Sequence, residues 1–256
     1  MTASRRSVAV MVVAAAIGAV CVRLGIWQLD RLEQRRAVNA AIVAGLAGAP
    51  LSPAAISALS STVDTRQLMW RPIRLAGVYD PANEVLLYGR PLEGRAGDHV
   101  LTPLVLDDGS AVVIDRGWVP FDPAAAVPLR GTAAPPTGRI VVDGVIMPPE
   151  DPGGDAEVRD GRVVRLGRVD LSRLASQLPY EVAPVAVLLR SQEPGQLAAL
   201  PRVVAPPVPD EGPHLSYAFQ WFTFAAVAVI GGVVLVRRGD AVRRRAPDDR
   251  SMEGPG

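Results

Sequence analysis

Two long apolar runs, one near each end of the chain, constrain this sequence more than any other feature. Val8 to Trp27 is interrupted by a single charge, at Arg23. Tyr217 to Val236 has Gln220 and Thr223 as its polar residues. Each run has about 20 residues, the length at which a helix crosses a hydrocarbon core of about 30 Å. We therefore predict two transmembrane helices that hold the rest of the chain at a lipid bilayer.

A cleaved signal peptide is the alternative for the first run. Arg5 and Arg6 precede it, and Ala14 to Ala16 weakly resembles a cleavage site. The apolar run continues past these alanines without a turn-forming break, and Val20 before Cys21 is not the small residue that a lipoprotein site requires. An uncleaved helix is favoured.

The placement of arginines predicts the orientation in the membrane. No Lys or Arg lies between Val203 and Val236, whereas the tail that follows is rich in basic residues: Arg237, Arg238, Arg243, Arg244, Arg245 and Arg250. The positive-inside rule then makes both termini cytoplasmic, which agrees with Arg5 and Arg6. A weaker opposing signal comes from the outer flank of the first run: Arg31, Arg35 and Arg36.

The predicted layout follows from these two helices. Residues 1–7 form a cytoplasmic N-terminus, residues 8–27 the first transmembrane helix, and residues 28–213 an extracytoplasmic domain. Residues 214–236 form the second transmembrane helix with an interfacial start, and residues 237–256 a cytoplasmic tail rich in arginine.

The central part of the chain begins as helix and continues as strands. Asp30 to Ala49 has a helical pattern that Pro50 ends, and Ser52 before Pro53 predicts the N-cap of a short helix. The pattern then changes to short alternating runs bounded by Gly, Pro or Asp. They are Arg71–Asp80, Glu84–Arg90, His99–Leu106, Ser110–Val119, Arg139–Met147, Val163–Asp170 and Val185–Arg190.

These strands predict a mainly antiparallel β domain, closed as a barrel or packed as a sandwich. Asp107-Asp108-Gly109 is typical of a hairpin turn, so the strands on either side of it should pair. Asp170–Leu178 is predicted as a helix with Asp170 as its N-cap. Stretches rich in Pro, Gly and Asp are predicted as loops, because they cannot hold a hydrogen-bonded ladder. They are Phe121–Gly138, Pro148–Arg162 and Glu193–Pro213.

Composition and motifs exclude several functions. A net charge of +1 without a basic stripe argues against nucleic-acid binding. The single cysteine, Cys21, excludes a disulfide framework and a site with paired thiolates. No nucleophile elbow, Walker loop, dinucleotide fingerprint or HExxH pair is present. The chain is therefore predicted not to be an enzyme.

His214 is the candidate ligand residue. It lies directly after Gly212-Pro213 and three residues before the second apolar run, which predicts a place at the outer membrane interface. From position alone, a polar interfacial histidine needs no special role. A neutral imidazole at the edge of an apolar pocket is, however, a usual axial ligand of haem iron. His99 lies on a predicted strand and is interpreted as structural.

Two further groups have mainly structural interpretations. Trp27, Tyr217 and Trp221 fall near the outer interface, where aromatic rings anchor helices whatever the function. Arg116 and Trp118 lie at a strand end, where the Arg is expected to pair with a carboxylate and the Trp to cover the edge of the core. A binding role for this strand end is the less favoured alternative.

Blocks of sequence along the chain resemble the Surfeit locus protein 1 (SURF1) family of cytochrome c oxidase assembly factors. They are Gly25-Ile26-Trp27-Gln28-Leu29-Asp30-Arg31, Arg71–Asp80, Arg90 through Gly97-Asp98-His99-Val100-Leu101-Thr102-Pro103-Leu104, Ile114–Pro120, and His214-Leu215-Ser216-Tyr217-Ala218-Phe219-Gln220-Trp221-Phe222. Each block is weak alone, but together they cover nearly the whole chain in order. The family commonly has Asn before the histidine of the last block, where this chain has Gly212-Pro213.

The resemblance implies a non-enzymatic role in maturing the haem-copper oxidase of a bacterial cell membrane. Haem a would be received from haem a synthase and presented to the catalytic subunit of cytochrome c oxidase. His214 would bind the iron, and Tyr217 and Trp221, three and seven residues further on, could flank the ring. The alternative is a stable structural subunit or scaffold of the oxidase or a respiratory supercomplex, without haem.

Overall fold

The computed structural model describes residues 5–59, 64–196 and 199–245. The chain divides into two compact units, one made of Met1–Asn39 with Asp210–Gly256 and the other of Ala40–Pro209. Parts of the predicted cytoplasmic ends, residues 1–4 and 246–256 with Arg250, lie outside the described residues.

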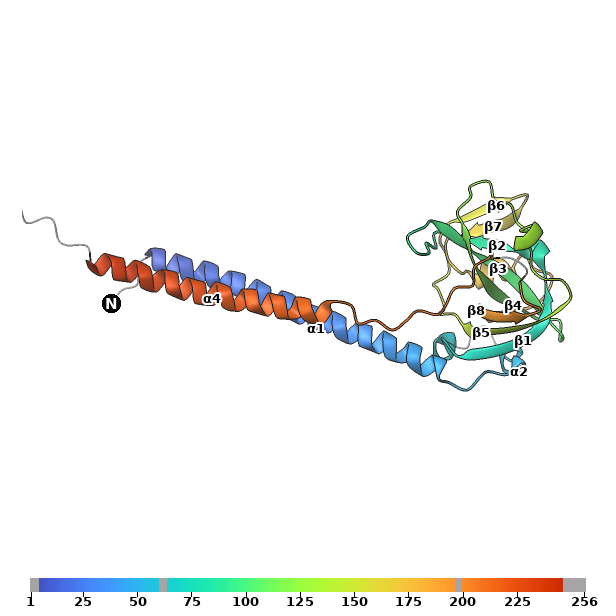
Figure 1. Cartoon of the computed structure of the whole chain (residues 1–256), viewed down its shortest axis with the longest axis horizontal. Helices are drawn as coiled ribbons and strands as arrows, with labels where there is room; N and C mark the ends of the chain where they lie inside the picture. The colour runs from blue at the N-terminus through green and yellow to red at the C-terminus, as the bar shows by residue number, and fades with distance from the viewer. Residues whose placement is uncertain (1–4, 60–63, 197–198, 246–256) are drawn as a thin grey trace, which may run out of the picture. The chain divides into compact units, whose positions relative to one another are not determined.

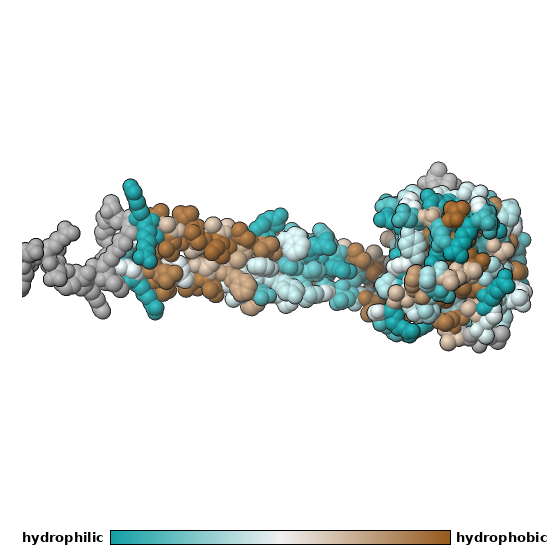
Figure 2. Space-filling view, turned by 90° about the horizontal axis from the view of Figure 1, so that it is seen from above, coloured by the Kyte–Doolittle hydropathy of each residue, from teal (hydrophilic) through white to brown (hydrophobic). Residues whose placement is uncertain are grey.

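Two long helices form the first unit: α1 (Arg5–Leu46), of which the residues up to Asn39 belong to this unit, and α4 (His214–Arg245). Both are long and apolar enough to cross a membrane, which confirms the two predicted apolar helices. They lie side by side in antiparallel directions (Figure 1), and Figure 2 shows an apolar band along the pair with hydrophilic residues at both of its ends. The helix predicted from Asp30 onward is not separate, because nothing between Trp27 and Asp30 breaks α1.

Small residues let the two helices approach closely. A Cβ atom added at Gly25 would lie 2.6 Å from the Phe222 ring, and one added at Gly232 would lie 2.6 Å from the Ala14 side chain. The buried residues of α4 in this region include Ala218 and Ala225. Because lipid tails are as apolar as these side chains, it is close packing of small residues that holds such a pair together.

The second unit is a β domain whose described strands form one sheet. The strands are β1 (Pro72–Tyr79), β2 (Val85–Leu87), β3 (Gly97–Leu106), β4 (Ala111–Pro120), β5 (Arg139–Ile146), β6 (Ala156–Arg159), β7 (Arg162–Leu166) and β8 (Val182–Glu193). Their order is β1-β5-β8-β4-β3-β2-β7-β6. Short helices lie between them: α2 (Pro53–Ser57), α3 (Leu171–Ala175), η1 (Thr65–Leu68), η2 (Pro81–Asn83) and η3 (Gly131–Ala133).

An additional pairing between β1 and β3 closes five of the strands into a barrel (Figure 1). The ring runs β1, β5, β8, β4, β3 and back to β1, so the predicted barrel-like domain is confirmed. Most pairs are antiparallel, but β4 pairs with β8, and β2 with β7, in parallel. Inward-facing residues of the ring, such as Leu75, Ile114 and Val187, form the main core.

The remaining strands extend the sheet beyond the barrel. β2 pairs with the first half of β3, and β7 and β6 follow it at the edge. A second core that includes Leu87, Leu166 and Leu174 lies on one face of this extension, and a smaller cluster of Leu86, Val100 and Val119 forms a third.

The turn and helix-cap signals in the sequence are confirmed by the structure, whereas one predicted loop is not. The β3–β4 hairpin forms as predicted, with Leu104 opposite Val112, and Ser52 and Asp170 cap α2 and α3 through their side chains. Burial alone would raise the pKa of Asp170, but hydrogen bonds from Ser172 and from two backbone N–H groups hold that pKa below its usual value. The loop predicted over Pro148–Arg162 is wrong in part: it contains β6, and Arg162 begins β7.

Candidate functional site

His214 is the first residue of α4, and the residues before it determine where the helix begins. Gly212 adopts φ of +66°, a conformation that favours glycine, and Pro213 follows. The Pro213 carbonyl accepts hydrogen bonds from the Tyr217 N–H (3.1 Å) and the Ser216 hydroxyl (2.8 Å). The His214 imidazole is therefore placed at the start of the apolar helix, where the sequence predicted it.

The structure pairs His214 with Gln28 of α1. Nδ1 of the imidazole lies 2.8 Å from Oε1 of the Gln28 side chain. An amide oxygen can only accept a hydrogen bond, so Nδ1 must carry the proton. In a neutral imidazole, Nε2 then keeps its lone pair. This is the form of histidine that can bind a metal ion through Nε2.

An ion pair lies just before the start of α4. Arg36 of α1 donates two hydrogen bonds to Glu211, at 2.8 and 2.9 Å. The hydrogen bond and the charge of Arg36 hold the pKa of Glu211 below its usual value. Both side chains are exposed, so the pair contributes little to stability, but its paired geometry restricts the segment that leads into α4.

Tyr217 and Trp221 both lie on α4, but they are not equivalent. Tyr217 is 47% exposed. Trp221 is partly buried and packs edge-on against Phe224, with ring centroids 5.9 Å apart. The structure thus brings His214 together with Gln28, while the ring contact of Trp221 is made along its own helix. The predicted role of the two aromatic residues beside a ligand stays a prediction.

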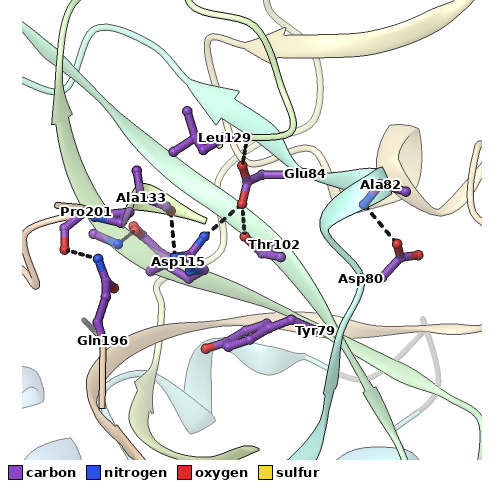
Figure 3. Close-up of polar contacts among 12 residues, drawn as sticks. Tyr79, Asp80, Ala82, Glu84, Thr102, Asp115, Leu129, Ala133, Gln196 and Pro201 are labelled. Atoms are coloured by element: carbon purple, nitrogen blue, oxygen red, sulfur yellow. Dashed lines mark hydrogen bonds and ion pairs between the residues drawn. The ribbon is translucent and has the colours of Figure 1, made fainter. Parts of the chain in front are cut away.

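The Arg116 block of the sequence is part of a buried polar network. Arg116 is fully buried and forms an ion pair of 2.9 Å with Glu84, which also accepts hydrogen bonds from the Thr102 hydroxyl and the Leu129 N–H. Figure 3 shows Glu84 at the centre of these contacts. Arg116 also donates to the carbonyl of Ala133. The network ties the segment around residues 129–133 to the barrel, which supports the structural interpretation of Arg116.

The two residues after Arg116 also have structural roles. Gly117 has φ of +122°, and a Cβ atom there would lie 2.2 Å from the carbonyl oxygen of Arg202. Trp118 is buried and donates its indole N–H to the carbonyl of Arg90. Two of the blocks that carry the family resemblance, around Arg90 and around Arg116, therefore meet in one packing unit.

His99 is also held by a buried partner. Its Nδ1 lies 2.6 Å from Oδ2 of Asp115, whose other oxygen accepts the Gly117 N–H. The pair belongs to the β3–β4 hairpin, which agrees with a structural role. Among the described residues, no group of three or more His, Cys, Asp or Glu side chains could hold a metal ion.

The β domain has an open groove of about 550 Å³, lined in part by Tyr88, Asp98, Phe121 and Arg165. Arg165 lies 3.3 Å from Asp98 and stacks on the Phe121 ring. Burial raises the pKa of Asp98, while the charge of Arg165 opposes that shift. The two charged groups thus partly neutralise each other at the groove.

Fold and site together define a class: a β-barrel domain joined to two apolar helices, with an oriented histidine at the start of the second. A model of the SURF1 family matches residues 15–226, a range that includes both Gln28 and His214. The chain belongs to the SURF1 family.

Several relatives agree with this assignment. An uncharacterized SURF1-like protein of Mycobacterium tuberculosis is 32% identical over 169 residues, which are 63% of this chain and 58% of that relative. SURF1-like proteins of Rickettsia bellii and Monosiga brevicollis are 25% and 23% identical and cover 91% and 89% of this chain, and 94% and 88% of their own lengths. The match thus spans little more than half of the mycobacterial relative.

Gln28 is the site residue that sequence reasoning missed. It was recognised only as a member of the block after the first apolar run, with no chemical role. It lies 186 positions before His214, so no local pattern joins the two. The one available signal was a polar side chain directly after an apolar run, since polar residues near such helices often bond across a helix interface.

Proposed function

We propose that this protein is an assembly factor of cytochrome c oxidase that binds haem a transiently and delivers it to the catalytic subunit. Membership of the SURF1 family implies the role in oxidase assembly. The observation that supports haem binding is the Nδ1 contact of His214 with Gln28, which leaves Nε2 as an iron ligand.

The surroundings of His214 fit such a cargo. Exposed apolar side chains on the first turns of α4, Leu215 and Phe219 among them, offer a surface for the porphyrin and its hydrophobic tail. Arg31 and Arg35 lie on the segment of α1 that follows Gln28, and guanidinium groups are suited to carboxylates such as haem propionates. Tyr217 and Trp221 would contact the ring by their places one and two turns beyond His214.

In this proposal the protein resides in the plasma membrane of a bacterium, with both termini in the cytoplasm and the β domain outside. Arg237 and Arg238 at the far end of the apolar part of α4 support that orientation. Haem a synthase and the oxidase catalytic subunit are the proposed partners, and no enzymatic step is assigned to the chain. The lack of an enzymatic activity stays a prediction.

The test is purification after co-expression with haem a synthase. We expect the full chain to carry a haem Soret band, and His214→Ala to reduce the bound haem by about 10-fold or more, because a lost axial ligand removes the iron–nitrogen bond. His99→Ala is a matched control, since His99 is engaged with Asp115. An unchanged band in His214→Ala would exclude His214 as the ligand.

The second candidate function is a permanent scaffold of the oxidase or a respiratory supercomplex. The same purification separates the two. A chain recovered in stoichiometric amounts with the mature oxidase, and without haem, would favour the scaffold. A haem-loaded chain that is absent from the mature oxidase supports delivery.

A further inference from the structure

We infer that Gln28 is the positioning residue of the His214 site. Its side-chain carbonyl holds the proton on Nδ1 and keeps Nε2 available as a ligand for haem iron. The inference rests on the proposed function for its biological meaning. The chemical statement in it, which concerns the tautomer of His214, can be tested without haem.

The first step of the argument is the geometry of the contact. A distance of 2.8 Å between Nδ1 and Oε1 is that of a normal hydrogen bond. A hydrogen bond from one ring nitrogen to a neighbouring helix fixes both the orientation of the ring and its tautomer. Without the acceptor, the ring could rotate or place its proton on Nε2, and Nε2 would then be blocked as a ligand.

The second step concerns what holds Gln28 itself. Gln28 lies on α1 three residues after Gly25, where the Phe222 ring of α4 packs so closely that an added Cβ atom would lie 2.6 Å from it. Farther along, Arg36 and Glu211 join α1 to the segment that precedes α4. Gln28 therefore lies between two contacts, that of Gly25 with Phe222 and that of Arg36 with Glu211. Together they define its position relative to the His214 ring.

The third step concerns the chemistry of the acceptor. Most ligating histidines donate their second N–H to a carboxylate, a backbone carbonyl or water, and a carboxylate makes the imidazole more basic. The Gln28 amide is neutral, so it orients the ring without adding that basicity. A ligand that is held in place but only moderately strong suits a site that must release its cargo.

The decisive measurement is the nitrogen NMR spectrum of the full chain in lipid nanodiscs, labelled with ¹⁵N-histidine. The sequence has two histidines, so subtracting the spectrum of His214→Ala assigns the signals. The spectrum is recorded in alkaline buffer, which favours neutral imidazole. We expect His214 to carry its proton on Nδ1 in the wild type and in Gln28→Glu.

In Gln28→Leu we expect a substantial fraction of the His214 rings to carry the proton on Nε2 instead of Nδ1. Gln34→Leu is the matched control, because Gln34 lies on the same helix and accepts its hydrogen bond from Arg31. A His214 signal that is the same in Gln28→Leu as in the wild type would overturn the inference.

Titration with ferric iron protoporphyrin IX links the hydrogen bond to ligand binding. We expect Gln28→Leu to weaken binding by roughly 10- to 100-fold, the usual effect of losing the partner of a ligating histidine. Gln28→Glu should bind at least as tightly as the wild type and release the haem to excess apomyoglobin more slowly. Equal affinities of Gln28→Leu and the wild type would remove Gln28 from the haem site even if the NMR result held.

Failure of the proposed function has a different signature. If the wild type and His214→Ala bind the porphyrin equally, haem binding by His214 is wrong whatever the NMR spectrum shows. The contact with Gln28 would then be a hydrogen bond that stabilises helix packing.

Discussion

Arg116 carries its charge in the interior of the β domain, where an unpaired charge would be very unfavourable. Burial lowers the pKa of Arg116, and the adjacent Glu84 carboxylate opposes that shift. Glu84 is itself almost completely buried and uses both oxygens in hydrogen bonds. The pair stabilises the domain only as long as both members are present.

We therefore expect Glu84→Leu to destabilise the protein by about 3–5 kcal/mol, because it leaves the Arg116 charge buried without a partner. The double variant Glu84→Leu/Arg116→Met should recover most of that loss. Chemical denaturation of the three proteins measures both effects.

Glu93→Ala is the control for this experiment, since it breaks an ion pair with Arg202 that is exposed on both sides. It should change the midpoint little. A Glu84→Leu protein as stable as the wild type would show that the buried pair is not a structural requirement.

The sequence predicted that Arg116 pairs with a carboxylate, but not which carboxylate it is. A buried strand-end Arg requires a carboxylate, which the sequence indicated, yet the chain has 26 acidic residues to choose from. Glu84 becomes the partner because it lies directly before β2, and β2 pairs with β3, the neighbour of β4 in the folded sheet. The Gln28 contact with His214 could not be predicted for the same reason, since it exists only when the helices pair.

At the scale of elements, the pairing of α1 with α4 depends on Gly25. A Cβ atom at this position would come within 2.6 Å of the Phe222 ring. We expect Gly25→Val to weaken the helix pair by about 1–3 kcal/mol through overpacking. Unfolding by sodium dodecyl sulfate, followed by circular dichroism, would measure the change.

Two further variants make this test specific. Adding Phe222→Ala to Gly25→Val should restore most of the stability, because it removes the ring that the new side chain meets. Gly231→Ala, where a Cβ atom meets nothing within 4 Å, should not weaken the pair. A loss in Gly231→Ala as large as that in Gly25→Val would contradict a specific contact at Gly25.

Elements with a strong periodic pattern could be predicted, whereas β6, at the edge of the sheet, was missed. β3 and β4 have long apolar runs and a clear turn, and they were found with the correct pairing. β6 reads Ala-Glu-Val-Arg and buries little, so its hydrophobic signal is weak. The Asp160-Gly161 turn that joins it to β7 was the usable signal for a hairpin there.

At the scale of the whole molecule, the hydrophobic cores of the β domain are formed by the residues of that domain. The three hydrophobic clusters consist of residues between Leu51 and Leu200, and the pairing of β1 with β3 closes the barrel. A domain of roughly 150–200 residues buries about 70% of the surface of its unfolded chain. We therefore expect the domain to be stable without α4 and without the part of α1 before Ala40.

We expect a fragment of Ala40–Pro209 to fold alone in water. It should show a β-type circular dichroism spectrum and a single cooperative unfolding transition, with Glu84→Leu lowering its midpoint as in the full chain. A fragment that binds hydrophobic dyes and unfolds without a cooperative transition would show that the helices are needed. The proposed haem site at His214 is absent from this fragment, so the fragment is not expected to bind haem.

The parallel pairing of β4 with β8 has a consequence for the newly made chain. β8 is the last of the described strands to be synthesised, yet it lies between β5 and β4 in the barrel. Until β8 is in place, both neighbouring strands present open edges to other chains. In the proposed topology, we expect the barrel to close only once β8 has been exported, just before the second helix enters the bilayer.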